Sequence, residues 1–316
     1  MYRKDFEILR CPICNSKIRF EYVHESYYCN NELCSKSHQN FPIVNGKPVL
    51  IDFEKSIINY DIFKKYEGRS VVVRRKKEIL VKMKSFFQGE SVITKKNIEL
   101  IIKMLSNIND PKILIIGGGE IGAGFDAFYK RYSNNILSFD IYESDYVDFI
   151  ADGHHIPVGS DYFDLVICQA VLEHVINPNG VALEINRVTK IGGLIYIETP
   201  FMQQVHEGPY DFTRFSESGH RLLFRNFKVI KSGYTAGAGT ALIWSLSYFF
   251  SGIFRTRLAG RIARIFFFWL RFFDSIIPSN YNIDAACGVY FFGKKSSFPI
   301  SNHSIINYYQ GVQIQK

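Results

Sequence analysis

Three closely spaced glycines follow a short aliphatic run in the first half of the chain. Residues 113–116 are Ile-Leu-Ile-Ile, and Gly117, Gly119 and Gly122 come directly after them. Four consecutive aliphatic residues are typical of a buried parallel strand, and the glycines allow a tight turn that exposes backbone N–H groups at the start of a helix. Such a turn suits a nucleotide-type cofactor. The Gly-x-Gly-x-x-Gly spacing by itself fits NAD and S-adenosylmethionine equally well.

Acidic and amide side chains end or follow the next hydrophobic runs. Asp140 ends the second predicted strand, Asp152 follows the third and Gln169 ends the fourth. The carboxyl ends of parallel strands share one edge of the sheet, where ligands bind. A carboxylate at Asp140 can accept hydrogen bonds from both hydroxyls of a ribose, and both candidate cofactors carry a ribose.

Strands and helices alternate after the glycines, which predicts an α/β fold with a doubly wound, mostly parallel sheet. Two later strands bring the expected number to seven, and the last strand should lie antiparallel beside the sixth. The expected elements are a helix over 123–132, strands over 136–140, 147–151 and 164–169, a helix over 179–189, a Gly192-Gly193 turn, and strands over 194–198, near 227–233 and from Gly288.

Several segments of this region resemble the class I S-adenosylmethionine-dependent methyltransferases (methyltransferase type 11-like). They are Asp-Gly-His-His-Ile-Pro at 152–157, the segment 161–175 that ends in Val-Leu-Glu-His-Val, and Glu-Ile-Asn-Arg-Val-Thr-Lys-Ile-Gly-Gly-Leu at 184–194. The resemblance is close over 113–200, because these motifs agree in order and spacing. It implies a seven-stranded Rossmann-like methyltransferase sheet and methyl transfer from S-adenosylmethionine. A nicotinamide oxidoreductase is supported only by the glycine pattern.

The resemblance also implies roles for particular residues. The glycine loop would hold the amino-acid part of the cofactor and Asp140 its ribose. Asp152 would approach the adenine, Gly153 would allow a close backbone contact, and Gln169 would lie under the methionine end.

Two positions depart from the family pattern. Many relatives carry an acid within the first strand, where this chain has Ile115, and Gly118 replaces a frequent Cys. The amino group of the cofactor would therefore contact Glu120 or a backbone carbonyl.

A loop rich in titratable and aromatic residues follows the fifth predicted strand. It contains His206, Glu207, Asp211 and Arg214 within 205–215. Methyl transfer requires a positioned nucleophile and removal of its proton. His206 is the first candidate for the general base, with Asp211 or Glu207 orienting the base or the acceptor. Arg214 would either bind an anionic acceptor or pair internally with Asp211.

A segment similar to His-Glu-Gly-Pro-Tyr-Asp-Phe-Thr-Arg-Phe occurs in methyltransferase-like proteins associated with bacterial surface-polysaccharide clusters. This similarity favours an oxygen or nitrogen acceptor on a surface-polysaccharide or glycolipid precursor. The alternative function is a non-catalytic cofactor-binding or scaffold module, at the membrane surface or in a complex. His154, His155 and His174 show no metal-ligand spacing on one helix, so we expect ordinary loop or packing roles for them.

Four cysteines near the N-terminus form two short pairs. Cys11 and Cys14 are separated by two residues, and Cys29 and Cys34 by four. In a reducing compartment such pairs favour a structural Zn²⁺ site over disulfides, because four thiolates can surround the ion tetrahedrally. The flanking Leu-Arg-Cys-Pro-x-Cys and Phe-Pro-Ile-Val-Asn-Gly-x-Pro-Val-Leu motifs resemble a zinc ribbon often fused to bacterial methyltransferases.

Residues 241–277, between the last two predicted strands, are unusually apolar and aromatic. Arg257, Arg261, Arg264 and Arg271 fall in one narrow stripe if this segment is a single helix. Such a basic amphipathic helix can lie at a membrane interface. The alternative is a helical cap that packs on its own domain or on a partner in a homodimer.

The composition is that of a globular protein. The chain has 316 residues, 47% of them hydrophobic, and a formal net charge of +8. The excess positive charge fits a solubilising surface, or contact with anionic lipid or glycan. The chain has no basic-aromatic nucleic-acid motif, which disfavours nucleic acid as a partner. The N-terminus lacks an apolar signal segment, so we expect a cytoplasmic protein, peripheral at the inner face of the membrane if it contacts lipid.

These patterns divide the chain into four parts. Within the second part, a basic run at 74–77 is expected on a solvated helix face, and Thr94 is expected to cap a helix over 95–107. The expected parts are a zinc-ribbon domain at 1–52, a helical connector at 53–110, a methyltransferase domain with its insert at 111–298 and a C-terminal tail at 299–316.

Overall fold

The computed structural model describes residues 6–69 and 91–313. The strands are β1 (Ile18–Glu21), β2 (Ser26–Cys29), β3 (Ile43–Val44), β4 (Lys47–Leu50), β5 (Ile113–Ile116), β6 (Ile136–Asp140), β7 (Phe149–Ala151), β8 (Phe163–Gln169), β9 (Thr189–Pro200), β10 (Phe227–Ala236) and β11 (Gly288–Lys295). The α-helices are α1 (Tyr60–Lys65), α3 (Val92–Leu105), α4 (Asp126–Tyr132), α5 (Pro178–Val188), α6 (Glu217–Leu223), α7 (Ala238–Ile253), α8 (Arg257–Phe266), α9 (Ser279–Asp284) and α10 (Asn302–Ile305).

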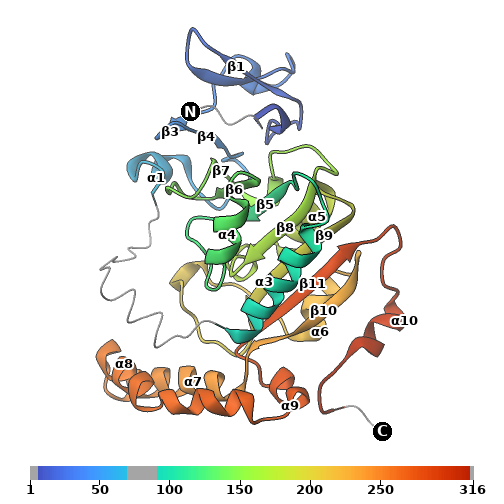
Figure 1. Cartoon of the computed structure of the whole chain (residues 1–316). Helices are drawn as coiled ribbons and strands as arrows, with labels where there is room; N and C mark the ends of the chain where they lie inside the picture. The colour runs from blue at the N-terminus through green and yellow to red at the C-terminus, as the bar shows by residue number, and fades with distance from the viewer. Residues whose placement is uncertain (1–5, 70–90, 314–316) are drawn as a thin grey trace.

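One mixed sheet organises the described residues (Figure 1). Its nine strands follow the order β10-β11-β9-β8-β5-β6-β7-β4-β3, while β1 and β2 form a separate two-stranded sheet. The strands from β5 to β9 run parallel, and β11 lies antiparallel between β9 and β10. The predicted doubly wound fold with seven strands is therefore confirmed. Two further strands from the N-terminal segment extend the sheet, because β4 pairs in parallel with β7.

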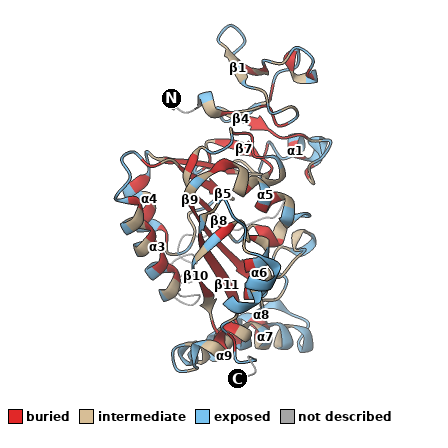
Figure 2. Cartoon of the chain, turned by 90° about the vertical axis from the view of Figure 1, so that its right-hand side faces the viewer, coloured by how far each residue is buried: buried red, intermediate tan, exposed pale blue. Residues whose placement is uncertain are grey.

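The fully buried strand β5 faces a helical layer on each side. Ile113 and Ile115 pack in one core with α3 and α4, whereas Leu114 and Ile116 pack in the other core with α5. Side chains alternate along a strand, so one short run serves both layers. Figure 2 shows the buried sheet between these helices. The helical layers hold the carboxyl edge of β5 rigidly, and the glycine turn follows directly.

Two expected details at element ends are wrong. Ser91, not Thr94, caps α3, because its side chain accepts the Thr94 N–H at 3.2 Å. The expected Gly192-Gly193 turn instead lies inside the continuous strand β9, where the pairing with β8 shifts between Phe163 and Leu165. Gly192 has a φ of 78°, so the glycine pair forms a bulge within the strand.

The segment expected as one arginine-striped helix is also divided. α8 ends at Phe266, and a 3₁₀ segment over Phe268–Ser275 carries Arg271. Asp274 from this segment accepts backbone N–H groups of Gly239, at 2.7 Å, and Thr240, at 3.2 Å. It thereby caps the first turn of α7 and folds the insert back on itself.

The basic run at 74–77 lies outside the described residues. Within the described ranges, no helix combines the length and the apolar character needed to cross a bilayer. Residues 299–313 pack back on the main body through Arg221, which donates to the Ile305 carbonyl at 2.9 Å, and Arg225, which donates to the Ile300 carbonyl at 2.8 Å.

A buried histidine packs against β11, an inner strand of the sheet. His220 in α6 is 1% exposed, and its ring packs against Phe215, Phe224 and Phe291. Neither ring nitrogen has a hydrogen-bond partner in the described residues. Burial lowers the pKa of His220 to about 3, so the folded protein keeps this imidazole neutral.

We expect acid destabilisation from His220 between about pH 6.5, its ordinary pKa, and about pH 3, its folded pKa. In this window the unfolded chain binds a proton that the folded chain rejects, so stability falls as the pH falls. Between pH 7 and pH 5 this one group costs about 2 kcal/mol. Urea unfolding of His220→Phe should show a pH dependence weaker by that amount, whereas the exposed-site control His155→Phe should behave like the parent. An identical pH slope in the parent and His220→Phe would contradict the assignment.

Candidate functional site

The glycine turn packs closely against the ends of neighbouring strands. Gly117 has a φ of 72°, and a Cβ there would lie 2.1 Å from Val171 Cγ2. A Cβ at Gly119 would lie 2.6 Å from Asp140 Oδ2, and one at Gly122 would lie 1.8 Å from Gln169 Oε1. The structure therefore brings three predicted groups together, namely the glycine turn, Asp140 and Gln169. Because these glycines lack side chains, the turn can lie this close to Asp140 and Gln169. We call the glycine turn with Asp140 and Gln169 the cofactor cradle.

Backbone donors orient the Asp140 carboxylate at the end of β6. Oδ2 accepts the Gly119 N–H at 2.9 Å, and Oδ1 accepts the Ile141 N–H at 2.7 Å. These bonds fix the carboxylate beside the glycine turn, as a ribose-binding group requires. The geometry fits the cofactor that the turn and the strand order imply.

Asp152 is held by hydrogen bonds within the protein, and its contact with the adenine stays a prediction. Its carboxylate is buried, accepts the Ser56 hydroxyl at 2.5 Å, and also accepts the His154 backbone N–H at 2.9 Å. His154 Nδ1 lies 2.6 Å from the same carboxylate. Burial opposes ionisation, but the bonds from His154 and Ser56 outweigh it and lower the pKa of Asp152. Both oxygens are engaged within the protein, and a Cβ at Gly153 would make only ordinary contacts with Val181.

A buried polar network supports Gln169 and was not expected from the sequence. Gln169 Nε2 donates to Glu198 Oε2 at 2.6 Å, and Thr94 donates to Glu198 Oε1 at 2.7 Å. The Tyr196 hydroxyl donates to the same carboxylate. Burial raises the pKa of Glu198 despite these donors. The available signal was an acid at the end of the otherwise apolar run 194–197.

Ile115 and Glu120 are the positions that concern the acid missing from the first strand. Ile115 is buried in the core with α3 and α4 and offers no polar group. Glu120 is exposed on the loop. Its contact with the cofactor amino group stays a prediction.

An ion pair closes the loop after β9. Both Asp211 oxygens accept from the Arg214 guanidinium, one of them at 3.0 Å, and Arg214 also donates to the carbonyls of Gln203 and Thr213. Burial opposes ionisation of Asp211, but the bonds from Arg214 and from the His206 backbone N–H lower its pKa to about 2. Asp211 is therefore a fixed anion at neutral pH.

His206 lies against this anion and beside a second histidine. His206 Nδ1 is 3.3 Å from Asp211 Oδ2, and its ring centroid is 5.0 Å from that of His174. Glu173 lies under both rings and is completely buried. Burial, aided by the charges of Asp211 and Glu207, raises the pKa of Glu173 to about 8. The structure thus gathers His206, Asp211 and Arg214, together with two residues that were not expected as site residues, Glu173 and His174.

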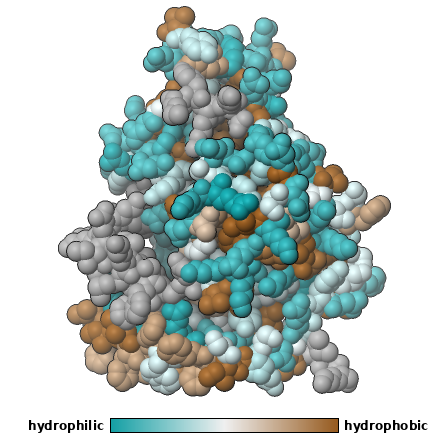
Figure 3. Space-filling model, in the orientation of Figure 1, coloured by the Kyte–Doolittle hydropathy of each residue, from teal (hydrophilic) through white to brown (hydrophobic). Residues whose placement is uncertain are grey.

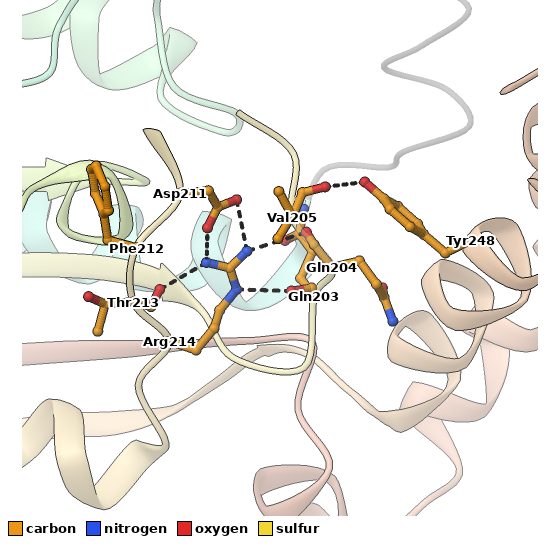
Figure 4. A pocket seen from close by; sticks show the side chains of 8 residues that line it. All are labelled: Gln203, Gln204, Val205, Asp211, Phe212, Thr213, Arg214 and Tyr248. Atoms are coloured by element: carbon orange, nitrogen blue, oxygen red, sulfur yellow. Dashed lines mark hydrogen bonds and ion pairs between the residues drawn. The ribbon is translucent and has the colours of Figure 1, made fainter. Parts of the chain in front are cut away.

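A pocket of about 460 Å³ opens beside the ion pair. Figure 4 shows the arrangement of its lining side chains, which come from the loop after β9 and from α7. The insert contributes directly, because the Tyr248 hydroxyl donates to the Val205 carbonyl and Gln204 Nε2 donates to Ser245 Oγ at 3.0 Å. The lining residues are Gln203, Gln204, Val205, Asp211, Phe212, Thr213, Arg214 and Tyr248.

The four N-terminal cysteines converge as a zinc site requires. Cys11 Sγ lies 3.8 Å from Cys34 Sγ, and Cys14 Sγ lies 3.4 Å from Cys29 Sγ. All four sulfur atoms lie within 4.8 Å of one another. Zn–S bonds of about 2.3 Å in a tetrahedron separate the sulfurs by about 3.8 Å. The donor set therefore fits a closed structural Zn²⁺ site, including the wide second pair.

Replacing Gly119 should weaken cofactor binding without unfolding the protein. A methyl group there displaces the Asp140 carboxylate from its backbone donors, so we expect Gly119→Ala to bind S-adenosylhomocysteine at least about tenfold more weakly, a loss of about 1.4 kcal/mol. Equilibrium dialysis measures this affinity. The matched control Gly252→Ala adds a methyl group in open space. Equal affinity in both variants would contradict the proposed cradle.

Removing one sulfur pair should release the structural metal. We expect the double variant Cys14→Ser and Cys29→Ser to contain one equivalent less zinc than the parent and to unfold at a lower temperature, because metal binding contributes folding free energy. Cys168→Ala, which changes a buried core cysteine, is the control for zinc content. Metal analysis that finds equal zinc in the parent and the double variant would refute the site.

The chain was compared with protein families, curated proteins and solved structures. Residues 118–197 match the methyltransferase domain family, and no curated protein matches the chain. Among solved structures, a SAM-dependent methyltransferase from Archaeoglobus fulgidus is 13% identical, with a TM-score of 0.43 over 69% of this chain and 100% of its own. The phosphoethanolamine N-methyltransferase 2 of Haemonchus contortus, solved with phosphomonomethylethanolamine and S-adenosylhomocysteine, is 13% identical, with a TM-score of 0.40 over 71% of this chain and 59% of its own.

The domain match covers the central part of the chain and can be compared with the described geometry. The domain match begins within the glycine turn and ends in β9. The order of the seven core strands and the Asp140 cradle agree with it. These findings show that residues 118–197 are similar to the methyltransferase domain family.

Proposed function

We propose that this chain is an S-adenosylmethionine-dependent methyltransferase that modifies an oxygen or nitrogen atom of an acceptor, bound in the pocket between the loop after β9 and α7. The observation that carries the proposal is the His206–Asp211–Arg214 arrangement, which lies at the carboxyl edge of the sheet beside that pocket. This edge is where the cofactor cradle also lies. Donor and acceptor sites at one edge are what a direct transfer requires.

His206, Asp211 and Arg214 have different roles in activating the acceptor. S-adenosylmethionine supplies an electrophilic methyl group when it is bound. Asp211 stays ionised, and its carboxylate faces His206 Nδ1 at 3.3 Å. This contact favours a proton on Nδ1 and leaves Nε2 to take the proton of a hydroxyl or amine. Arg214 is a positioning residue, because its donors hold Asp211 and the loop carbonyls.

The lining of the pocket favours an acceptor rich in hydroxyl groups. Gln203, Gln204 and Thr213 offer amide and hydroxyl groups, while Phe212 and Tyr248 offer aromatic rings. The Gln204 Oε1 atom is buried and has no hydrogen-bond partner in the described residues. A sugar hydroxyl would satisfy it. This chemistry supports a glycan precursor as the acceptor.

The helical insert favours an acceptor carried by a lipid. Its exposed apolar side chains include Phe254, Phe266 and Ile276, at 62%, 70% and 71% exposure. Figure 3 shows hydrophobic atoms gathered at the lower edge, where α7 and α8 lie in Figure 1. Residues 238–277 contain five arginines and a single acid, Asp274. A basic, aromatic surface beside the pocket suits the interface of an anionic membrane.

The direct test is methyl transfer from labelled S-adenosylmethionine to a cell-envelope extract that contains lipid-linked glycans. We expect label in the glycolipid fraction, and His206→Ala should slow the transfer by about 100-fold or more while the affinity for S-adenosylhomocysteine is retained. His155→Ala, outside the pocket, is the control. A protein that binds the cofactor but labels no fraction would support the scaffold alternative and contradict this proposal.

Membrane contact can be tested separately by flotation with vesicles that contain anionic lipid. We expect the parent to float with these vesicles more than with neutral ones, and the double variant Phe254→Ser and Phe266→Ser to lose binding, because each change removes apolar area from the interface. Phe298→Ser, which alters an even more exposed aromatic residue outside the insert, is the control. A stable dimer that covers the insert, together with no flotation, would favour the dimer alternative.

A further inference from the structure

Glu173, His174 and His206 converge on one point behind the acceptor pocket. Glu173 Oε1 lies 3.6 Å from His174 Nε2 and 3.9 Å from His206 Nε2. One ligand atom from each residue lies within 4.8 Å of the other two. Phe212 and Thr213, which line the pocket, donate their backbone N–H groups to the Glu173 carbonyl. The cluster is therefore attached directly to the pocket wall.

Glu173 lacks the hydrogen bonds that a buried carboxyl group requires. Its side chain is 1% exposed, and neither carboxylate oxygen has a hydrogen-bond partner in the described residues. A buried polar group without a partner costs free energy, and buried carboxylates are normally paired or coordinate a metal ion. Oε1 lies within 4 Å of Nε2 of both histidines, so three electron-rich ligand atoms face one another.

The outer nitrogen of each histidine is bonded so that the inner nitrogen can act as a ligand. His174 Nδ1 lies 2.7 Å from the Tyr210 carbonyl. A carbonyl can only accept, so Nδ1 carries the proton and the lone pair of Nε2 faces Glu173. His206 Nδ1 lies near the Asp211 carboxylate, at 3.3 Å, and the Gln204 carbonyl, at 3.4 Å. Carbonyl and carboxylate partners of this kind typically orient metal-binding histidines.

We propose that Glu173, His174 and His206 bind a divalent first-row transition-metal ion such as Zn²⁺, Mn²⁺ or Fe²⁺. Two imidazoles and one carboxylate are a ligand set for such ions, whereas Mg²⁺ and Ca²⁺ prefer oxygen ligands alone. Three protein ligands leave a coordination position open, as in catalytic metal sites. This site is distinct from the four-cysteine cluster, which provides four ligands and no open position.

The inference deepens the proposed function and rests on it in placing the acceptor beside His206. An ion at Nε2 of His206 takes the lone pair that a free imidazole would use as a base. A bound ion would supply Lewis-acid chemistry at its open coordination position and would lower the pKa of an acceptor hydroxyl there. The hydroxyl proton would pass to solvent water, the oxygen would take the methyl group from the sulfonium, and S-adenosylhomocysteine would leave. The proposed function predicts a need for His206, and the metal site adds a need for Glu173 and His174.

Metal binding itself provides the test. The apo full-length protein is titrated with Co²⁺, which gives intense charge-transfer absorption when bound by thiolates and weaker visible bands when bound by nitrogen and oxygen ligands. We expect two classes of site in the parent. Glu173→Gln, which keeps the shape of the side chain, should lose the nitrogen–oxygen class and retain the thiolate class, with affinity for the former reduced by at least about 100-fold.

A second variant guards against a folding defect caused by changing a buried residue. The His206 side chain is 24% exposed, so His206→Gln should fold normally and lose the same class of site. His155→Gln should retain both classes. A parent that binds Co²⁺ only at thiolates, or variants that keep the nitrogen–oxygen site, would overturn the inference and leave the methyl-transfer proposal intact. Co²⁺ binding at the nitrogen–oxygen site without any methyl transfer would support the metal site and contradict the proposed function.

Discussion

The ion pair between Asp211 and Arg214 fixes the acceptor side of this protein. Arg214 bonds to both oxygens of Asp211 and to three carbonyls of the same loop. A guanidinium group offers five donors in a planar fork, so one side chain can fold a loop back on itself. Asp211 in turn accepts the His206 backbone N–H and lies beside its ring. This ion pair therefore holds the loop in the conformation that forms the pocket wall, positions His206 and contacts α7.

The cofactor side depends on close approach rather than on charge. Gly119 and Gly122 lie so near to Asp140 and Gln169 that side chains at the glycines would displace both groups. Gln169 is itself held by Glu198, which also binds the α3 residue Thr94. A buried network of this kind favours a single arrangement of its members when each polar atom is paired. β5 itself carries no acid, and Glu198 is a buried acid near the end of β9 at the same edge of the sheet.

Much of the fold could be predicted from local patterns, since strand runs and turn glycines carry their own physical signal. The strand at 136–140 was predicted to the residue. Seven core strands, with the last antiparallel beside the sixth, were also expected. The bulge at Gly192 was not predicted, because the pairing register depends on the neighbouring strand β8. The added pair of β4 with β7 is likewise a long-range contact between residues about a hundred positions apart.

In the candidate site, too, residues placed by local sequence patterns were predicted, whereas those brought together by long-range contacts were not. Asp140 and the cysteines were recognisable, because short spacings and strand ends place them. His174 was expected to be an ordinary packing residue, since no second ligand shares its helix. Its partner His206 arrives from another loop, and only the folded chain brings the two rings to 5.0 Å. Glu173 gave no sequence signal for its isolation, because burial without a hydrogen-bond partner is a property of the packed structure.

The central claim is that the cofactor cradle and the acceptor pocket serve one reaction. An experimental structure with S-adenosylhomocysteine bound tests it most directly. The account predicts that the ribose hydroxyls lie within hydrogen-bond distance of the Asp140 carboxylate, with the sulfur atom directed toward His206 and the pocket beside Arg214. A ligand bound elsewhere, or one whose sulfur atom faces away from the loop after β9, would contradict it.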